Sequence, residues 1–298
     1  MPLDISTPVP RVKAKELTRK EFEEKYLFPQ KPVVLEGLLA DQPCFTKWSY
    51  DFFKKEMGDQ QVGIFDVKKG AADRSYKAPD DYMPFGEYLD VLQGGPSPIR
   101  LFLFDIFKHN PALKKDVSFP KITGKWNKRF MFTFFGGQGS VARNHQDMDM
   151  ANVFLTQFEG VRHVILFDPK FSELLYRYPF NVHSAIDVDK PDFETYPGLK
   201  YVKGYETRLY RGDTLFMPSG YWHHIRYEKG GYGMALRSWS PNLKLRFQGL
   251  LNVAILTHLD EIFLKISPKG WYNWKKKTAV KRANKAIERA KAGEFTTA

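Results

Sequence analysis

The chain contains almost no cysteine: Cys44 is the single one among 298 residues. One thiol cannot form an internal disulfide, and it cannot supply the sulfur ligands of a Cys-rich zinc site. The sequence also lacks an apolar run of membrane-spanning length, and we expect no signal peptide, because the N-terminal Met1-Pro2-Leu3-Asp4 has no charged start followed by an apolar run. We therefore expect a cytoplasmic protein that does not associate with membranes.

Carboxylates are scarce in the C-terminal tail. The whole chain has 46 Lys and Arg against 34 Asp and Glu, for a formal net charge of +12. Between residues 265 and 291, ten basic residues are opposed only by Glu288, so this segment holds most of the excess. Such a cluster can bind nucleic acid or another acidic surface. It can equally be the solvated face of a helix, and the sequence leaves both interpretations open.

Aromatic residues, by contrast, are abundant, at 15% of the chain with 25 phenylalanines, which suits a β-rich core. Short strand patterns separated by Gly and Pro turns predict a sandwich or jelly roll. The expected strands cover residues 99–104, 129–135, 140–147, 152–158, 161–167, 205–210, 214–217, 221–227 and 232–239. Gly160 is expected to separate two of them as a hairpin turn would, and residues 172–203 form an insert.

Helical patterns flank this strand-rich part. The N-terminal third predicts helices at 17–26, 49–57 and 83–92, strands at 31–37 and 61–67, and a loop at 71–79. Thr18 and Ser49 are the expected N-caps. After Pro241, apolar residues at helical spacing predict helices at 245–264 and 277–292. We divide the chain into an N-terminal α/β elaboration (1–98), a β core (99–241) and a C-terminal helical region (242–298).

Two distant motifs supply candidate metal ligands. The first is Asn144-His145-Gln146-Asp147, and the second is the segment 212–224, which reads GDTLFMPSGYWHH. Residues two apart on a strand point the same way, so His145 and Asp147 share a face. A later histidine brought alongside would complete a 2-His-1-carboxylate triad, which binds Fe(II) and leaves coordination positions open. A lone His-x-Asp is common, and the second motif is what strengthens the prediction.

Together the motifs resemble those of the cupin-like JmjC hydroxylases, Fe(II)- and 2-oxoglutarate-dependent oxygenases built on a double-stranded β-helix. The likeness covers most of the chain and includes an asparaginyl hydroxylase and a tRNA hydroxylase of that family. Further matching segments are Lys31-Pro32-Val33-Val34-Leu35-Glu36-Gly37, Lys47-Trp48-Ser49, residues 160–167 and residues 192–197. The resemblance implies a jelly roll that uses Fe(II), 2-oxoglutarate as cosubstrate, and O2.

The resemblance also implies roles for individual residues. His145, Asp147 and His223 match the family's metal ligands, with His223 preferred to His224 because it stands five residues after Pro218. Arg162 occupies the place of the lysine that binds the far carboxylate of 2-oxoglutarate, and an arginine can pair with a carboxylate through two hydrogen bonds. The other expected cosubstrate-site residues are Asn152, Arg237 and Trp239.

Two positions depart from the asparaginyl hydroxylase. Phe102 replaces a tyrosine and Ala142 replaces a threonine, so two hydroxyl donors are missing. These changes favour an alternative class, a non-catalytic cupin-type module that binds a metal or small ligand. We nevertheless expect an enzyme that hydroxylates a C–H bond, and a protein side chain is the first choice of substrate.

A tRNA substrate is the second choice, supported by the basic tail, and a free amino acid or other small molecule is the third. The resemblance further implies a homodimer formed through the C-terminal helices. No function is expected of the remaining histidines, which are His109, His163, His183 and His258.

Overall fold

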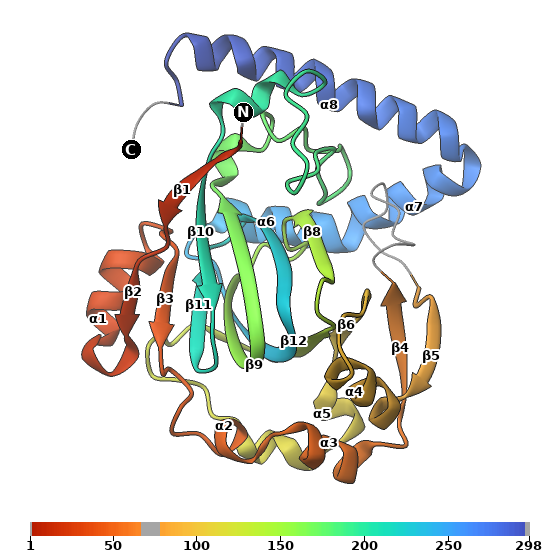
Figure 1. The fold of residues 1–298 in the computed structure, drawn as a ribbon. Coiled ribbons are helices and arrows are strands. Elements are labelled where there is room, and N and C mark those ends of the chain that lie inside the picture. The colour runs from red at the N-terminus through yellow and green to blue at the C-terminus, as the bar shows by residue number, and fades with distance from the viewer. Residues whose placement is uncertain (1, 67–77, 296–298) are drawn as a thin grey trace.

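The computed structural model describes residues 2–66 and 78–295. The expected loop at 71–79 lies mostly outside these ranges. At the centre of the molecule is a 12-stranded mixed sheet with the order β2-β3-β11-β9-β12-β7-β6-β4-β5. β10 pairs with β1 and β9, and β8 pairs with β12 (Figure 1). The sheet has the cupin jelly-roll fold predicted from the sequence, with helices around it.

Every expected strand overlaps an observed one. The strands are β1 (Asp4–Pro8), β2 (Arg11–Lys13), β3 (Val33–Glu36), β4 (Gln61–Asp66), β5 (Asp81–Pro84), β6 (Ile99–Phe104), β7 (Trp126–Gly136), β8 (Val141–His145), β9 (Asn152–Phe167), β10 (Lys203–Leu209), β11 (Asp213–Met217) and β12 (Trp222–Ser238).

The predicted hairpin at Gly160 is wrong, because β9 continues through it as one strand of 16 residues. β12 likewise joins two expected strands, and it pairs with β9 from Ser238 opposite Asn152 to Trp222 opposite Phe167. Gly160 has a φ of 80°, and a Cβ there would lie 2.4 Å from the carbonyl oxygen of Gly230. Glycine therefore permits a bulge where the two strands bend together, rather than a reversal of the chain.

The helices are α1 (Arg19–Phe22), α2 (Pro43–Lys47), α3 (Tyr50–Met57), α4 (Phe85–Gln93), α5 (Ile106–His109), α6 (Leu243–Leu251), α7 (Thr257–Ile266) and α8 (Pro268–Lys291), with π-helical turns at Glu23–Leu27 and Asn252–Leu256. Both predicted caps are confirmed. Thr18 forms a capping box with Glu21, and the Ser49 hydroxyl accepts a hydrogen bond from the Phe52 amide. Within the described ranges, no helix has both the length and the apolar character needed to cross a bilayer.

Helices cover the sheet on two sides. One core packs the N-terminal helices against the sheet, with Phe22, Trp48, Phe53, Phe85 and Phe135 all buried in it. A second core joins the insert between β9 and β10 to α8, which crosses the top of the molecule in Figure 1. Between these two layers, apolar side chains of β9, β11 and β12 form the inside of the jelly roll, where the candidate site lies.

Candidate metal centre and cosubstrate pocket

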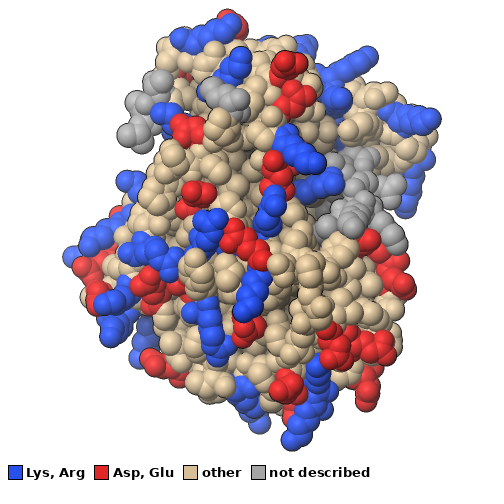
Figure 2. All heavy atoms as spheres, viewed as in Figure 1, with Lys and Arg blue, Asp and Glu red and all other residues tan. Residues whose placement is uncertain are grey.

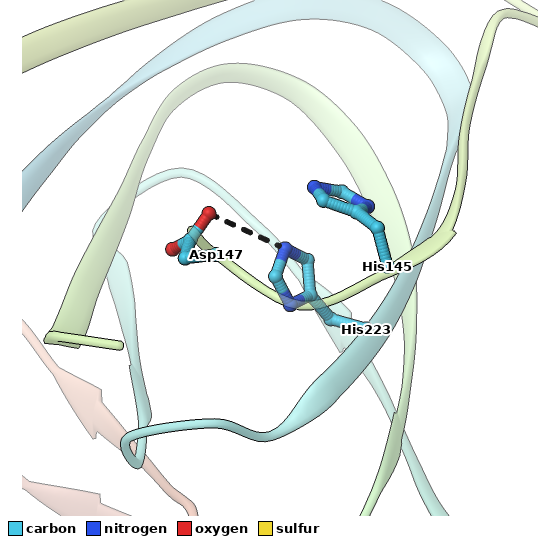
Figure 3. Close-up of side chains that lie close together, drawn as sticks. All are labelled: His145, Asp147 and His223. Atoms are coloured by element: carbon cyan, nitrogen blue, oxygen red, sulfur yellow. Dashed lines mark ion pairs between the residues drawn. The ribbon is translucent and has the colours of Figure 1, made fainter. Parts of the chain in front are cut away.

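His145 and His223 lie opposite each other on the adjacent antiparallel strands β8 and β12, with ring centroids 4.1 Å apart. β8 ends at His145, so Asp147 is placed by the turn that follows, in which the Met150 amide donates to the Asp147 carbonyl. The carboxylate nevertheless points to the two imidazoles (Figure 3). One potential ligand atom from each residue lies within 4.8 Å of the others, and His223 Nε2 is 4.0 Å from Asp147 Oδ1.

Backbone carbonyls orient both imidazoles. His145 Nδ1 is 2.7 Å from the Arg143 carbonyl oxygen, and His223 Nδ1 is 3.2 Å from that of Tyr221. Because a carbonyl only accepts hydrogen bonds, each Nδ1 carries the proton. Each Nε2 is therefore left with a lone pair for a metal.

The electrostatics of the site give each ligand the protonation state that metal binding requires. Arg237 is buried, and its Nη2 lies 3.2 Å from Asp147 Oδ2 while its Nη1 lies 2.6 Å from Asp149 Oδ1. Burial raises the pKa of Asp147, but Arg237 and the two imidazoles outweigh it and lower that pKa to about 2. Burial also lowers the pKa of both His145 and His223. At neutral pH the set is one carboxylate and two neutral imidazoles, which fits Fe(II).

The triad opens into a pocket on the inside of the jelly roll. Its lining is mostly apolar and consists of Arg100, Leu101, Phe102, Leu103, Phe134, Ala142, His145, Asp147, Val153, Leu155, Arg162, Met217, His223, Ile225, Tyr227, Ala235 and Arg237. A few charged groups among apolar walls are typical of a site that binds a small polar molecule and excludes water.

Arg162 is the most deeply buried cation of this pocket, with 1% of its surface exposed. Its Nη2 donates to the Phe134 carbonyl, and its guanidinium lies 4.7 Å from the centre of the Tyr227 ring. Its Nε has no hydrogen-bond partner, and among the described residues no carboxylate pairs with it. Burial lowers the pKa of this guanidinium. A buried charge without a counter-ion is costly, so the pocket is suited to an anionic ligand.

Two expected cosubstrate residues lie outside the pocket. Asn152 is buried, and its side-chain Oδ1 accepts a hydrogen bond from the Ser219 backbone amide. Its Nδ2 donates one to the Ser238 hydroxyl. It therefore ties the turn before β12 to the end of that strand. Trp239 is 47% exposed, and the Arg246 guanidinium lies 5.7 Å from its ring centre. Asn152 begins β9 and Trp239 follows β12, and at the end of a strand the sequence does not define the direction of a side chain.

The two adjacent histidines of β12 face opposite ways, as strand alternation predicts. His223 faces the pocket, whereas His224 Nε2 lies 3.1 Å from Asp189 of the insert. Trp222 shares that outer face and donates from its indole to the Ser172 hydroxyl.

Sequence reasoning missed His183. Its ring stacks on that of His145, with centroids 5.7 Å apart and planes inclined by 21°. His183 belongs to the insert, and no periodicity in the insert predicts that it returns to the metal centre.

A cupin jelly roll with a two-histidine, one-carboxylate set beside a pocket that contains buried cations is typical of one class, the cupin-like domains of the JmjC type. The family model "Cupin-like domain" matches residues 19–242, which is more than half of the chain. The chain therefore belongs to the cupin-like domain family, and the resemblance found in the sequence is confirmed.

Similar proteins include lysine-specific demethylase 8 of Xenopus tropicalis, 28% identical over 233 residues, which are 75% of this chain and 51% of that protein. tRNA wybutosine-synthesizing protein 5 of Gallus gallus is 29% identical over 250 residues, 76% of each chain. JmjC domain-containing protein D of Dictyostelium discoideum is 26% identical over 234 residues, 69% of this chain and 51% of that protein. This chain thus spans about half the length of the demethylase.

Proposed function

We propose that the chain is an Fe(II)- and 2-oxoglutarate-dependent oxygenase that hydroxylates a C–H bond. The substrate that we favour is a protein side chain. The observation that supports this proposal is the triad of His145, Asp147 and His223, with ligand atoms within 4.8 Å of one another at the wall of a pocket. Membership of the cupin-like domain family supports the same activity.

Each residue of the site has a distinct task in this proposal. Fe(II) held by the triad would activate dioxygen while 2-oxoglutarate is oxidised. The carbonyl acceptors of Arg143 and Tyr221 keep the ring planes fixed. Arg237 restrains the Asp147 carboxylate, and its second bond to Asp149 keeps the guanidinium itself in place.

Arg162 would receive the far carboxylate of 2-oxoglutarate. The cation is buried, it lines the same pocket as the triad, and its Nε has no partner. An arginine can bind a carboxylate through two parallel hydrogen bonds, which would fix the orientation of the cosubstrate. The apolar walls around it would exclude water during the reaction.

Phe102 and Ala142 both line this pocket, so neither position supplies a hydroxyl to the cosubstrate. Tyr227 lines it as well, opposite Arg162 in the pairing of β9 with β12. We expect the Tyr227 phenol to provide a hydrogen-bond donor to the cosubstrate. The missing hydroxyls at Phe102 and Ala142 are then a weaker argument for a non-catalytic binding module.

The decisive experiment measures succinate formed from 2-oxoglutarate without any second substrate, after anaerobic loading with Fe(II) and admission of oxygen. An oxygenase is expected to produce succinate slowly in this uncoupled reaction, and Asp147→Ala is expected to abolish it. Tight binding of 2-oxoglutarate without succinate would favour the cupin-type binding module instead.

A tRNA substrate is the second candidate, and a specific surface favours it. An open groove along α8 is lined by Asn273, Lys276, Lys277, Val280, Lys281, Asn284 and Lys285. Figure 2 shows basic side chains gathered at the upper right of the molecule, where Figure 1 shows the beginning of α8. The relative from Gallus gallus is named for a role in tRNA modification. We still favour a protein substrate over tRNA, because the basic groove on α8 shares no lining residue with the pocket that contains the triad.

A further inference from the structure

The C-terminal helices lie beyond residue 242, where the family match ends, yet they contact the segment that carries the candidate ligands. Asn252, in the π-helical turn after α6, donates to the Met148 carbonyl at 3.0 Å. Gly249 of α6 packs so closely that a Cβ there would lie 2.2 Å from the Asp149 carbonyl oxygen. The turn after His145 therefore rests directly on α6.

A second connection starts at Asp260 of α7, whose side chain is buried. Its Oδ1 accepts from the Trp271 indole at 2.6 Å and from Lys275 Nζ at 2.8 Å, and both donors belong to α8. Its Oδ2 accepts from the Asn181 amide of the insert at 3.1 Å. A buried carboxylate is stable only when it is paired and hydrogen-bonded in this way.

Asp260 determines which way the Asn181 amide points. A carboxylate only accepts hydrogen bonds, so the Asn181 side chain must direct its Nδ2 towards Asp260. Its Oδ1 then points towards His183. That oxygen accepts from the His183 backbone amide at 2.9 Å and lies 3.0 Å from His183 Nδ1. The His183 Nδ1 therefore carries the proton, and the plane of the ring is fixed.

His183 in turn contacts the candidate metal ligand His145. Its ring stacks on the His145 ring with centroids 5.7 Å apart, and the two residues form an antiparallel backbone bridge. The Gln146 amide donates to the Val182 carbonyl at 2.9 Å and extends this pairing. A rotation of the His183 ring would open space on the face of His145 that is now in contact.

We propose that Asp260 is a positioning residue for His145, acting through Asn181 and His183, so that the C-terminal helices help to set the metal affinity. This inference rests on the proposed function, because it takes His145 as a metal ligand. Groups behind a metal ligand fix the orientation of the ligand, and their loss typically lowers metal affinity about 10- to 100-fold.

The test replaces Asn181, because Asn181→Ala breaks the connection while Asp260 keeps Lys275 and Trp271 as partners. The measurement is Mn(II) binding to the full chain, by calorimetry, with the absorption spectrum of bound Co(II) as a second readout. We expect the Kd for Mn(II) to rise about tenfold and the Co(II) spectrum to change.

Trp271→Phe is the matched control. It removes one hydrogen bond to Asp260 but leaves the path through Asn181 and His183 intact, so it is expected to lower the Tm without changing the Mn(II) Kd. His183→Phe is the second test variant, since it keeps a stacking ring, loses the Nδ1 hydrogen bond and leaves the buried network at Asp260 complete. It too is expected to weaken Mn(II) binding.

Wild-type Mn(II) affinity and an unaltered Co(II) spectrum in Asn181→Ala and His183→Phe would overturn the inference and leave the network a purely stabilising role. If Asn181→Ala does not fold, His183→Phe decides alone. A wild-type chain that binds no Mn(II) would instead overturn the proposed metal centre, and this inference with it.

Discussion

His223 and His224 are neighbours in the sequence with opposite environments, and this difference can be tested. His223→Ala should abolish stoichiometric metal binding, because it removes one of three ligands. His224→Ala should retain the metal and lose some stability, because His224 contacts Asp189 on the outer face. The measurement is metal content after anaerobic reconstitution with Fe(II), with Mn(II) as a redox-inert check. An empty His224→Ala protein would show that the wrong histidine has been assigned.

Arg162 is the residue on which cosubstrate binding is expected to depend most. Arg162→Ala should weaken binding of 2-oxoglutarate to the Mn(II)-loaded protein by about 3 kcal/mol, the order of magnitude for unpairing a buried charge. Arg162→Lys is the control, because it keeps the charge and loses only the two-point geometry. Calorimetry distinguishes the variants. Unchanged affinity in Arg162→Ala would move the role to Arg237 or Arg100, the other two cations that line the pocket.

Asp189 gives the fold a predictable sensitivity to acid. Burial raises its pKa, but hydrogen bonds from His224 and Arg226 outweigh this and lower the pKa from 3.8 to about 2. A carboxyl whose pKa is lower in the folded state stabilises the protein above its unfolded pKa and loses that contribution as the pH falls. The stabilisation should therefore be complete above pH 3.8 and disappear towards pH 2.

Asp189→Asn should accordingly flatten the dependence of the urea midpoint on pH across this acid window. The Asn variant should also be less stable than wild type at neutral pH, and equally stable at the acid end. Urea titrations at a series of pH values measure both. A parallel loss of stability at every pH would mean that Asp189 acts through packing and not through its charge.

Strand alternation and motif spacing predicted the positions of several individual residues. His145, Asp147, His223 and Arg162 all line one pocket, and their roles as metal ligands and cosubstrate anchor stay predictions. His183 was not predictable, because its position depends on how an irregular insert folds back over β8. Asn152 and Trp239 lie at strand ends, where neighbouring turns determine the direction of the side chain.

At the scale of elements, the order of the core strands was predictable, whereas their continuity and the short strands β1, β2 and β5 were not. A glycine between two apolar strand patterns indicates a hairpin as readily as a bulge. Only the pairing of β9 along the whole length of β12 distinguishes the two outcomes at Gly160. α8 begins at Pro268, earlier than the expected helix at 277–292, because its first turns are held by the buried Lys275–Asp260 pair rather than by apolar spacing.

α6 carries its large apolar residues on the outside. Leu243, Phe247 and Leu250 are 72%, 61% and 63% exposed, at helical spacing, whereas the apolar face of α8 is covered by the insert. An exposed apolar patch of this kind is typical of an interface. We therefore expect a homodimer formed through α6 and α7, with α8 taking little part.

The double variant Phe247→Glu and Leu250→Glu should be folded and monomeric, because each buried carboxylate would oppose association. Phe28→Glu with Tyr82→Glu is a matched control, since these residues are 52% and 62% exposed and do not belong to the C-terminal helices. Sedimentation velocity at micromolar concentration measures the result. A wild-type chain that sediments as a monomer would contradict the expectation.

For the molecule as a whole, the sequence predicted a β core between helical flanks but not how the flanks depend on the core. The C-terminal region was expected to be an appendage. In the structure, its last helix completes a core with the insert, and its first helix supports the turn that carries Asp147. These are contacts between segments far apart in the chain, and apolar periodicity reports only that a helix has a face to bury.

The same packing explains how the positive charge of the molecule is displayed. The apolar residues of α8, among them Ala279, Ala283 and Ile287, pack against the insert. The lysines between them are consequently exposed, and they line an open groove with Asn273 and Asn284. Four lysines, Lys276, Lys277, Lys281 and Lys285, are thus gathered on one surface, as binding to a polyanion would require.

If this groove binds tRNA, Lys276→Glu, Lys281→Glu and Lys285→Glu combined should weaken tRNA binding and reduce its salt dependence. Each phosphate that the protein no longer neutralises should lower the slope of log K against log salt by about 1. Fluorescence anisotropy over a salt series measures both.

The control makes the same change of charge far from α8, with Lys13→Glu, Lys20→Glu and Lys25→Glu, whose side chains are all exposed. Long-range electrostatics alone would weaken tRNA binding equally in both triple variants, since their net charges are identical. A groove that binds phosphates should make the α8 variant much the weaker binder, with the smaller salt slope. Equal affinities and equal slopes would show that α8 is a solvated helix face and would remove the main structural support for a tRNA substrate.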